Sequence, residues 1–390
     1  MTFTFLMDPV DDSLRAVEKH LESNPDDASA WNAKGVFHAQ KREFGEAIRC
    51  LDRALGLQPD LTIAHANRGR VLLALGPDKA GDALKSIEKA LDQTPDDVEI
   101  LRDKAMALHA LGRTADELVS YQQMSELLPN EWGIWVRIGD IQLELGNFDP
   151  AVVCYDKAIA LKDDIVPAYI RRAIALAMLE RWRDAIKSSE TATKLDPDNP
   201  EAWLIQGDVN LRAGKHRSAM KALKKASELD PENATVENTM GMVCYKDGKL
   251  SDAVKHLRRA LIRKRDYPTA MRNLGLVSME LEEWEDAANA FSGYVSLVKD
   301  DPDMYDAKAT AYARLDDFCT AEEAWEKARK LYKKAGNTTE SDRVTALGRA
   351  ARINCSRVKK AVKEQREQEK QQRRFSDRHE RRRKKTNRRT

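Results

Sequence analysis

Small residues recur every 34 residues along most of this chain, and this spacing limits the folds that the chain can adopt. The step from Gly69 to Ala105 is the exception, because it is 36 residues long. Two further series of mostly small residues keep fixed distances from the first, as Ala219 and Ala226 do in one unit. Self-similarity at a period of about 20–50 residues is typical of repeat proteins. The positions of the first series are Gly35, Gly69, Ala105, Gly139, Ala173, Gly207, Gly241, Gly275 and Ala309.

Each unit has the pattern of two short amphipathic helices joined by a turn. Helix axes pack about 8–10 Å apart, and their closest approaches need Gly or Ala at the crossing. A larger apolar residue, such as Leu223, lies between the two alanines and is expected to fill the space beside the crossing. Asp-Pro at 196–197 predicts the end of a second helix, because proline lacks an N–H and disfavours helix at the preceding residue. The sequence therefore predicts a stack of helix pairs.

The spacing of the larger residues carries a resemblance to a known family. Trp135 is followed after two residues by Ile138-Gly139, and Ala151 is followed after three residues by Tyr155. In these motifs the chain resembles a tetratricopeptide-repeat (TPR) protein over residues 28 to about 333. The resemblance implies an all-α fold, a right-handed α-α superhelical solenoid of helix-turn-helix repeats, here with a long C-terminal helix.

The repeat register predicts the organisation of the whole chain. Residues 1–27 are expected to be an N-terminal segment with a capping helix, and Met7 is an alternative start to Met1. Residues 336–362 are expected to form a C-terminal capping helix, because apolar residues recur there at helical spacing. Residues 363–390 are predicted to be a basic, disordered tail. The nine repeats within 28–335 are expected at 28–61, 62–97, 98–131, 132–165, 166–199, 200–233, 234–267, 268–301 and 302–335.

Three departures from the pattern occur. In repeat three, Glu117 stands where a small residue belongs, and Met124 follows it in the same repeat. Repeat two has two extra residues around Pro77-Asp78. In repeat eight, Tyr294 replaces an alanine. One interpretation is a local adjustment of helix spacing. The other is a kink that creates a binding pocket near repeats two and three.

The resemblance also implies a candidate site, because the first helix of each repeat lines a concave groove in this family. Such a mixture of arginine, methionine, aliphatic and amide groups suits a peptide with some acidic character. The alternative is a solvated face with internal ion pairs. Asn67 and Asn273 fit the middle position of the family's clamp for chaperone tails, but their neighbours do not, so that clamp is not expected. The predicted groove residues are Asn67, Arg70, Arg102, Met106, Arg137, Arg171, Met178, Met242, Tyr245, Arg272 and Asn273.

Charge is distributed unevenly along the chain. Residues 357–390 hold 16 Lys or Arg and 5 Asp or Glu, and the whole chain has a net charge of +2, so residues 1–356 carry −9. The basic segment could be solvated, could bind nucleic acid or the ribosome through phosphates, or could serve as a localisation signal or membrane contact. Its candidate anion-binding residues are Arg373, Arg374, Arg381, Arg382, Arg383, Lys384, Lys385, Arg388 and Arg389.

Motifs for catalysis are lacking in the sequence. It has no Gly-rich phosphate loop, no H-E-x-x-H motif and no nucleophile elbow, so no catalytic residue, cofactor, metal site or small-molecule substrate is predicted. The five cysteines lack metal-ligand spacing and are expected to be reduced in a cytoplasmic, soluble protein without a transmembrane segment. The predicted function is a non-catalytic scaffold or adaptor for protein–protein interaction. The alternatives are a nucleic-acid- or ribosome-associated factor and a chaperone-like holder of unfolded chains.

Overall fold

Helices joined by short turns make up the described part of the molecule. The computed structural model describes residues 9–386, and within this range it holds twenty α-helices, one short 3-10 helix and no strand. The predicted all-α solenoid of helix pairs is thereby confirmed. Both candidate starting methionines lie outside the described residues. The chain divides into two compact units, residues 1–197 and 198–390, which are described separately.

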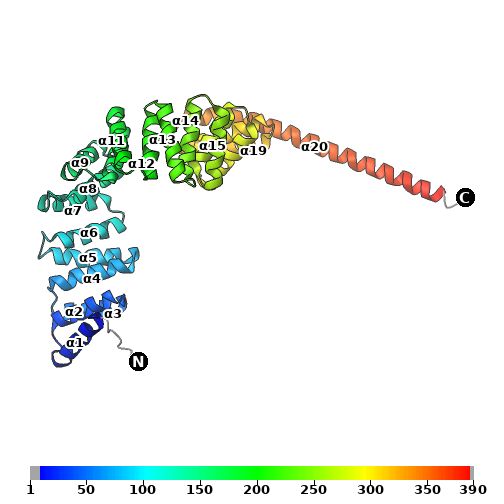
Figure 1. The fold of residues 1–390 in the computed structure, drawn as a ribbon. Helices are drawn as coiled ribbons and strands as arrows, with labels where there is room; N and C mark the ends of the chain where they lie inside the picture. The colour runs from blue at the N-terminus through cyan, green and yellow to red at the C-terminus, as the bar shows by residue number, and fades with distance from the viewer. Residues whose placement is uncertain (1–8, 387–390) are drawn as a thin grey trace, which may run out of the picture. The chain divides into compact units, whose positions relative to one another are not determined.

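The N-terminal unit consists of one initial helix and five helix pairs. Successive helices pack against one another, and the pairs stack in chain order (Figure 1). The first helix of every pair begins at the residue where the sequence places the start of a repeat. The helices are α1 (Pro9–Ser23), α2 (Ala28–Gln40), α3 (Phe44–Leu57), α4 (Thr62–Leu75), α5 (Ala80–Leu91), α6 (Val98–Ala110), α7 (Thr114–Leu127), α8 (Trp132–Glu144), α9 (Phe148–Leu161), α10 (Val166–Met178) and α11 (Trp182–Leu195).

The C-terminal unit contains four further pairs and a much longer last helix. Its first helices also begin at the expected repeat starts. The helices are α12 (Pro200–Arg212), α13 (His216–Leu229), α14 (Ala234–Lys246), α15 (Leu250–Arg263), α16 (Pro268–Glu280), α17 (Trp284–Leu297), α18 (Pro302–Arg314), α19 (Phe318–Lys334) and α20 (Thr338–Thr386).

The small residues lie where the two helices of a repeat cross. A Cβ atom added to Gly139 would lie 2.7 Å from Cε1 of Tyr155, and one added to Gly207 would lie 2.6 Å from Leu223. Such distances are far below van der Waals contact, so a side chain there would force the helices apart. The larger residue between the alanines therefore packs onto the glycine, as the sequence predicts.

The two extra residues of repeat two form a short 3-10 helix between α4 and α5, η1 (Pro77–Lys79). Gly76 precedes it with a φ of 124°, a value that L-residues with side chains rarely adopt. The insertion is thus confined to the inner turn. Helix α4 has 14 residues, one more than the first helices of the other repeats, and α5 has 12, two fewer than most second helices.

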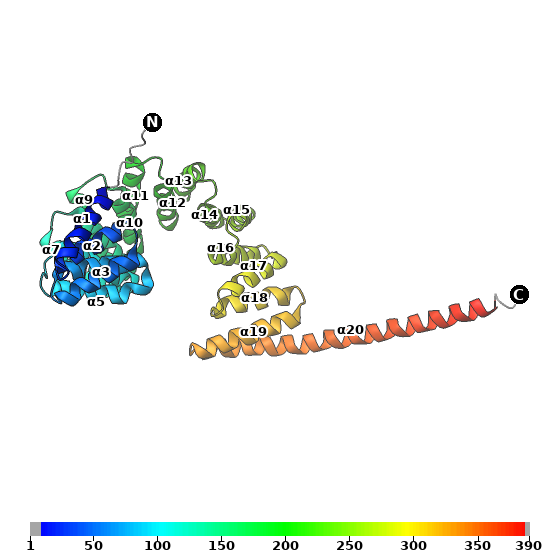
Figure 2. The ribbon, with the colours of Figure 1, turned by 90° about the horizontal axis from the view of Figure 1, so that it is seen from below.

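Helix α20 is longer than predicted. Val344, Ala351 and Cys355 are buried, and the first part of α20 packs on α19. The helix then continues beyond α19 to Thr386, as Figure 2 shows, so the predicted end at Val362 and the predicted disorder of residues 363–386 are both wrong. Glu, Gln, Lys and Arg are strong helix formers, and this segment has no Gly or Pro, so it needs no apolar stripe to be helical.

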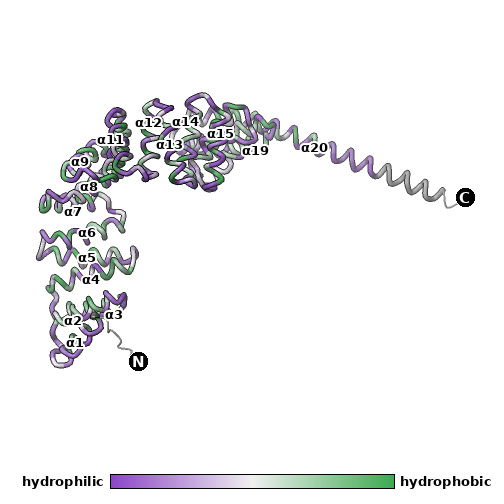
Figure 3. Tube along the Cα trace, viewed as in Figure 1, coloured by the Kyte–Doolittle hydropathy of each residue, from purple (hydrophilic) through white to green (hydrophobic). Residues whose placement is uncertain are grey.

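The side chains of α20 are described as far as Arg373, and every residue from Ser356 to Arg373 is exposed. Figure 3 shows that the hydrophobic colouring of α20 gives way to hydrophilic residues beyond its contact with α19. Of the predicted anion-binding residues, the side chains of those after Arg373 are not described, and Arg388 and Arg389 lie outside the described residues altogether.

A disulfide joins the last two helices. Cys319, near the start of α19, is bonded to Cys355 of α20. The expectation that all cysteines are reduced is therefore wrong for this pair, while the buried residues Cys50, Cys154 and Cys244 remain free thiols. Sequence spacing could not reveal the pair, because the two residues are 36 positions apart and meet only when α20 folds back along α19.

Candidate functional site

The predicted groove residues of the N-terminal unit all lie on first helices. α4 carries Asn67 and Arg70, α6 carries Arg102 and Met106, α8 carries Arg137, and α10 carries Arg171 and Met178. Asn67, Arg137 and Arg171 occupy the sixth position of their repeats, and Arg70 and Met106 occupy the ninth. Across helix boundaries, Asn67, Arg70 and Arg137 pair with residues outside the predicted set, as described next.

Hydrogen bonds link these side chains from α2 to α6. Asn67 Nδ2 donates to Oδ1 of Asn32 on α2 at 2.9 Å, and Arg70 Nε donates to Oδ2 of Asp103 on α6 at 2.6 Å. Burial raises the pKa of Asp103 above its ordinary value, although the charge of Arg70 acts in the opposite direction. Arg70 Nη1 also donates to Oδ1 of Asn67 at 3.5 Å, so Asn32, Asn67, Arg70 and Asp103 form a continuous polar row, called here the amide–arginine row, across three first helices.

Two exposed residues lie next to this row on α6. Arg102 donates to Glu99 at 2.9 Å within the same helix, and both side chains are largely exposed. Met106 is 54% exposed, which leaves an apolar side chain open to a partner. On α10, Met178 is also exposed. Burial and Asp140 raise the pKa of the Tyr155 hydroxyl, and the charge of Arg171 across the repeat boundary opposes that rise.

Arg137 is already engaged inside the protein. Its Nη2 donates to Oε1 of Glu117 on α7 at 2.9 Å, and the Glu117 side chain is only 2% exposed. His109 Nδ1 lies 3.1 Å from the other carboxylate oxygen. The Arg137 guanidinium also lies over the ring of Tyr121. Arg137 therefore neutralises the unusual glutamate of repeat three, a pairing that the sequence did not reveal.

The C-terminal unit repeats part of this arrangement. Asn273 Nδ2 donates to Oδ1 of Asn238 at 2.9 Å, so α14 and α16 are joined by the same two repeat positions as α2 and α4. A hydrogen bond to Glu280, with some burial, raises the pKa of Tyr245. Met242 is half-buried and Arg272 is exposed.

A second buried glutamate lies in the C-terminal unit. Glu237 takes the position that tryptophan holds in other repeats, and its side chain is 5% exposed. Its carboxylate lies 2.7 Å from His256 Nδ1 and 2.6 Å from Arg263 Nη1. An acidic residue at a tryptophan position is the only sign of this cluster in the sequence. The cluster joins α14 to α15 and is buried, so it stabilises the pair rather than facing a partner.

Residues 9–386 lack two other kinds of feature, a metal-binding group and a membrane-spanning helix. No group of His, Cys, Asp or Glu there could hold a metal ion. No helix in this part of the chain is long and apolar enough to cross a membrane.

The stacked helix pairs, with polar rows along their first helices, define a tetratricopeptide-repeat solenoid, a class that presents extended surfaces to partner proteins. The model of the cilia and flagella-associated protein 70 C-terminal domain matches residues 79–347, and a tetratricopeptide-repeat model matches residues 10–62. Because the first match covers more than half of the chain, the chain belongs to this family of tetratricopeptide-repeat domains. Neither model describes a catalytic domain.

Individual proteins and solved structures match the chain at low sequence identity. Protein FlbA of Caulobacter vibrioides is 26% identical over 184 residues, which cover 47% of this chain and 30% of FlbA. Anaphase-promoting complex subunit 3 of Schizosaccharomyces pombe is 23% identical over 189 residues, 48% of this chain and 28% of that subunit. The chain thus matches less than a third of the length of these relatives. The crystal structure of the APC/C hetero-tetramer Cut9-Hcn1 gives a TM-score of 0.49 at 16% identity, covering 85% of this chain and 81% of that one.

Proposed function

We propose that this protein is a non-catalytic scaffold that binds a segment of a partner protein along the first helices of its N-terminal unit. The amide–arginine row is the observation that carries the proposal. Its members hold one another across α2, α4 and α6 by hydrogen bonds of 2.6–2.9 Å. Side chains that are already ordered lose little conformational entropy when a partner binds, so this surface is prepared for binding.

The chemistry of the row suits an extended peptide. Asn67 donates one amide hydrogen to Asn32, and its carbonyl oxygen accepts from Arg70 Nη1 at 3.5 Å. Its second amide hydrogen and second oxygen lone pair match the C=O and N–H of a peptide backbone. Met106 offers a flexible apolar contact beside these groups. Since Arg70 and Arg102 already pair with Asp103 and Glu99, the face does not select strongly acidic segments.

Paired substitutions of exposed apolar residues test this proposal. Met106 is 54% exposed on α6, and Val119 is 60% exposed on the second helix α7 of the same repeat. Peptides selected from a random phage library against the wild-type protein are expected to lose at least tenfold in affinity for Met106→Glu. Val119→Glu, which adds the same charge away from the row, should bind them normally. Equal effects of the two substitutions, or no effect of either, would contradict the proposal.

A second candidate function is favoured by the distal part of α20. Lys359, Lys363, Arg366, Lys370 and Arg373 follow one another at spacings of three or four residues and are all exposed. On a helix this places five cations on one face over about 21 Å. We infer that this cationic row binds the phosphate backbone of a nucleic acid. Residues 1–356 are acidic and would repel phosphates, so binding would be confined to this helix.

Salt dependence and matched neutralisation test the cationic row. If all five cations contact phosphates of duplex DNA, a plot of log K against log[salt] has a slope of about −4 or steeper. Lys363→Gln/Arg366→Gln should reduce affinity more than Arg357→Gln/Lys360→Gln, which removes the same charge from the other side of the helix. Salt-independent binding, or equal losses in both double variants, would reject a role for this face.

A further inference from the structure

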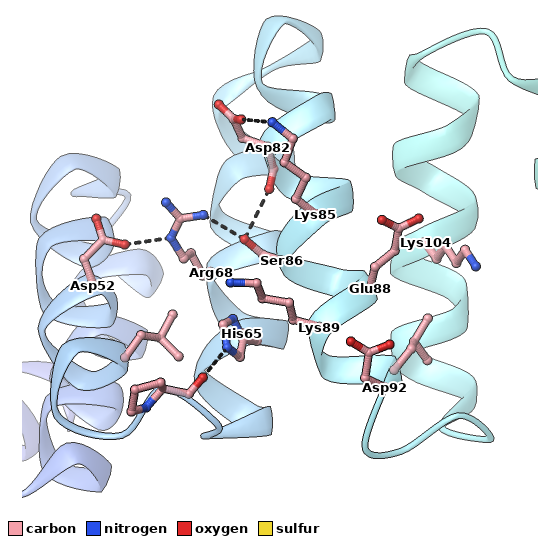
Figure 4. Close-up of a pocket in the computed structure, with 13 residues that line it drawn as sticks. Asp52, His65, Arg68, Asp82, Lys85, Ser86, Glu88, Lys89, Asp92 and Lys104 are labelled. Carbon is pink, nitrogen blue, oxygen red and sulfur yellow. Dashed lines mark hydrogen bonds and ion pairs between the residues drawn. The ribbon is translucent and has the colours of Figure 1, made fainter.

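A cleft of about 1020 Å³ opens between the first three repeats. It is lined by residues of α3, α4, α5 and α6, among them Leu55, His65, Arg68, Ser86 and Lys89 (Figure 4). None of the predicted groove residues lines it, and neither does Glu117. The cleft is therefore separate from the amide–arginine row, and an inference about it does not depend on the function proposed above.

The cleft forms in repeat two, which lacks the tryptophan found at the equivalent position of repeats one, four and six. In repeats one and four, Trp31 and Trp135 donate their indole N–H to the carbonyl oxygens of Pro25 and Pro129, at 2.8 and 2.9 Å. His65 occupies the same position in repeat two, and its Nε2 donates to the Pro59 carbonyl at 2.8 Å. The imidazole thus keeps the hydrogen bond of the indole, but it has no second ring to fill the adjoining space.

A lysine beside this space lacks the aromatic partner that the equivalent lysine has in repeat four. In repeat four, the Lys157 ammonium lies 3.8 Å from the centroid of the Trp135 ring. Lys89 stands at the equivalent position of repeat two, once the two-residue insertion is counted. Figure 4 shows its side chain extending toward the middle of the cleft. Within residues 9–386, Lys89 has neither an ion pair nor a ring contact.

The polar wall of the cleft is an ordinary part of the repeat framework. Arg68 donates to Asp52 and to Ser86, both at 2.7 Å, and Arg172 makes the same two contacts with Asp156 and Ser188 in repeat five. The unusual feature is thus the missing ring and not the wall. Consistent with this, Nδ1 of His65 is buried and has no hydrogen-bond partner in the described part of the chain.

We propose that this cleft binds an aromatic side chain of a partner protein, with its ring in the space between His65 and Lys89. The ring would restore the arrangement of Trp135 beneath Lys157, and the ammonium would lie over its face. An anion is a poorer match, because Arg68 and Lys85 are already paired with acids and the acidic residues Glu88 and Asp92 also line the cleft.

The test uses the full chain and a fluorinated probe, N-acetyl-5-fluorotryptophan amide, observed by fluorine NMR. Saturable broadening is expected with the wild-type protein. His65→Trp fills the cleft with the protein's own indole and should weaken probe binding at least tenfold. Tyr169→Trp adds an indole at the same position of repeat five and should leave binding unchanged. Lys89→Gln, an exposed substitution, should weaken binding about threefold through loss of the cation–π contact.

Several outcomes would overturn the proposal. The proposal is wrong if the probe fails to bind the wild-type protein, or if it binds His65→Trp equally well. If circular dichroism shows that His65→Trp is unfolded, Lys89→Gln decides, and its unchanged affinity rejects the site. N-acetyl-aspartate amide, observed by saturation-transfer NMR, serves as the anionic comparison. Binding of that compound in place of the indole would make the cleft an anion site and the proposal wrong.

Discussion

Glu117 and Arg137 meet at the boundary between repeats three and four, where Oε1 of the carboxylate accepts a hydrogen bond from Nη2 at 2.9 Å. The glutamate occupies a position that belongs to alanine in the other repeats, and its side chain is 2% exposed. Burying an unpaired carboxylate is costly, so the arginine makes this replacement tolerable. Arg137 is one of the predicted partner-binding residues, but its pairing with Glu117 stabilises the packing between repeats three and four.

The first prediction concerns the asymmetry of this pair. Arg137→Ala leaves a buried carboxylate with only His109 beside it, and we expect a loss of about 2 kcal/mol in the free energy of unfolding of the N-terminal unit. Glu117→Ala restores the repeat pattern and leaves an arginine that can reach water, so its effect should be below about 1 kcal/mol. Urea denaturation measures both. The double variant should recover most of the loss, and an Arg137→Ala protein as stable as Glu117→Ala would contradict this account.

The second prediction concerns pH. Burial raises the pKa of Glu237, but Arg263 and His256 lower it by more, so its pKa lies below the ordinary value. A carboxylate with a depressed pKa in the folded state stabilises that state above its ordinary pKa of about 4.3, and the contribution disappears as the pH falls through the folded-state pKa. Amide hydrogen exchange in α14 and α15 should therefore accelerate as the pH falls below about 5, after correction for intrinsic rates. Glu237→Gln should show fast exchange throughout, and an equal pH response in that variant would contradict the assignment.

The third prediction concerns the disulfide. Cys355 is the last buried residue of α20 among those with described side chains, so its bond to Cys319 holds the helix where it leaves the solenoid. Closing a loop of this length stabilises a folded protein by about 2–4 kcal/mol. Reduction, or Cys319→Ser/Cys355→Ser, should lower the stability of the C-terminal unit by that amount. The triple variant of Cys50, Cys154 and Cys244 to Ser retains the disulfide and should still respond to reductant. Five alkylatable thiols in the non-reduced, unfolded protein would disprove the bond.

The fold could be predicted because local periodicity determines it. Each repeat packs mainly on its neighbours, so the spacing of residues such as Gly139 and Tyr155 already contains the main contact. The start of every first helix follows from the same register. The family resemblance likewise identified the helices that carry the amide–arginine row.

The state of the site residues could not be predicted, because it depends on contacts between repeats. Arg70 and Asp103 are 33 residues apart, and Arg137 and Glu117 are 20 apart, with no sequence rule to pair them. The length of α20 does not follow from hydrophobic spacing, because the helix continues beyond its last apolar residues. Helix propensity accounts for the extension, since the side chains from Ser356 to Arg373 are all exposed.

The last prediction tests the close helix crossing on which the repeat depends. Gly139→Ala would place a methyl group 2.7 Å from the Tyr155 ring, and overpacking of this kind costs about 1–3 kcal/mol. Alanine also gains up to about 1 kcal/mol of helix propensity over glycine, so the expected net loss is about 1 kcal/mol. Gly133→Ala, in the same helix, is the matched control, because the nearest atom to its added Cβ is Glu131 Oε1 at 3.5 Å. That control should raise the free energy of unfolding, measured by urea denaturation. If both variants are stabilised alike, the helices of repeat four have room for a methyl group at the crossing. The recurrence of small residues there would then have a cause other than close packing.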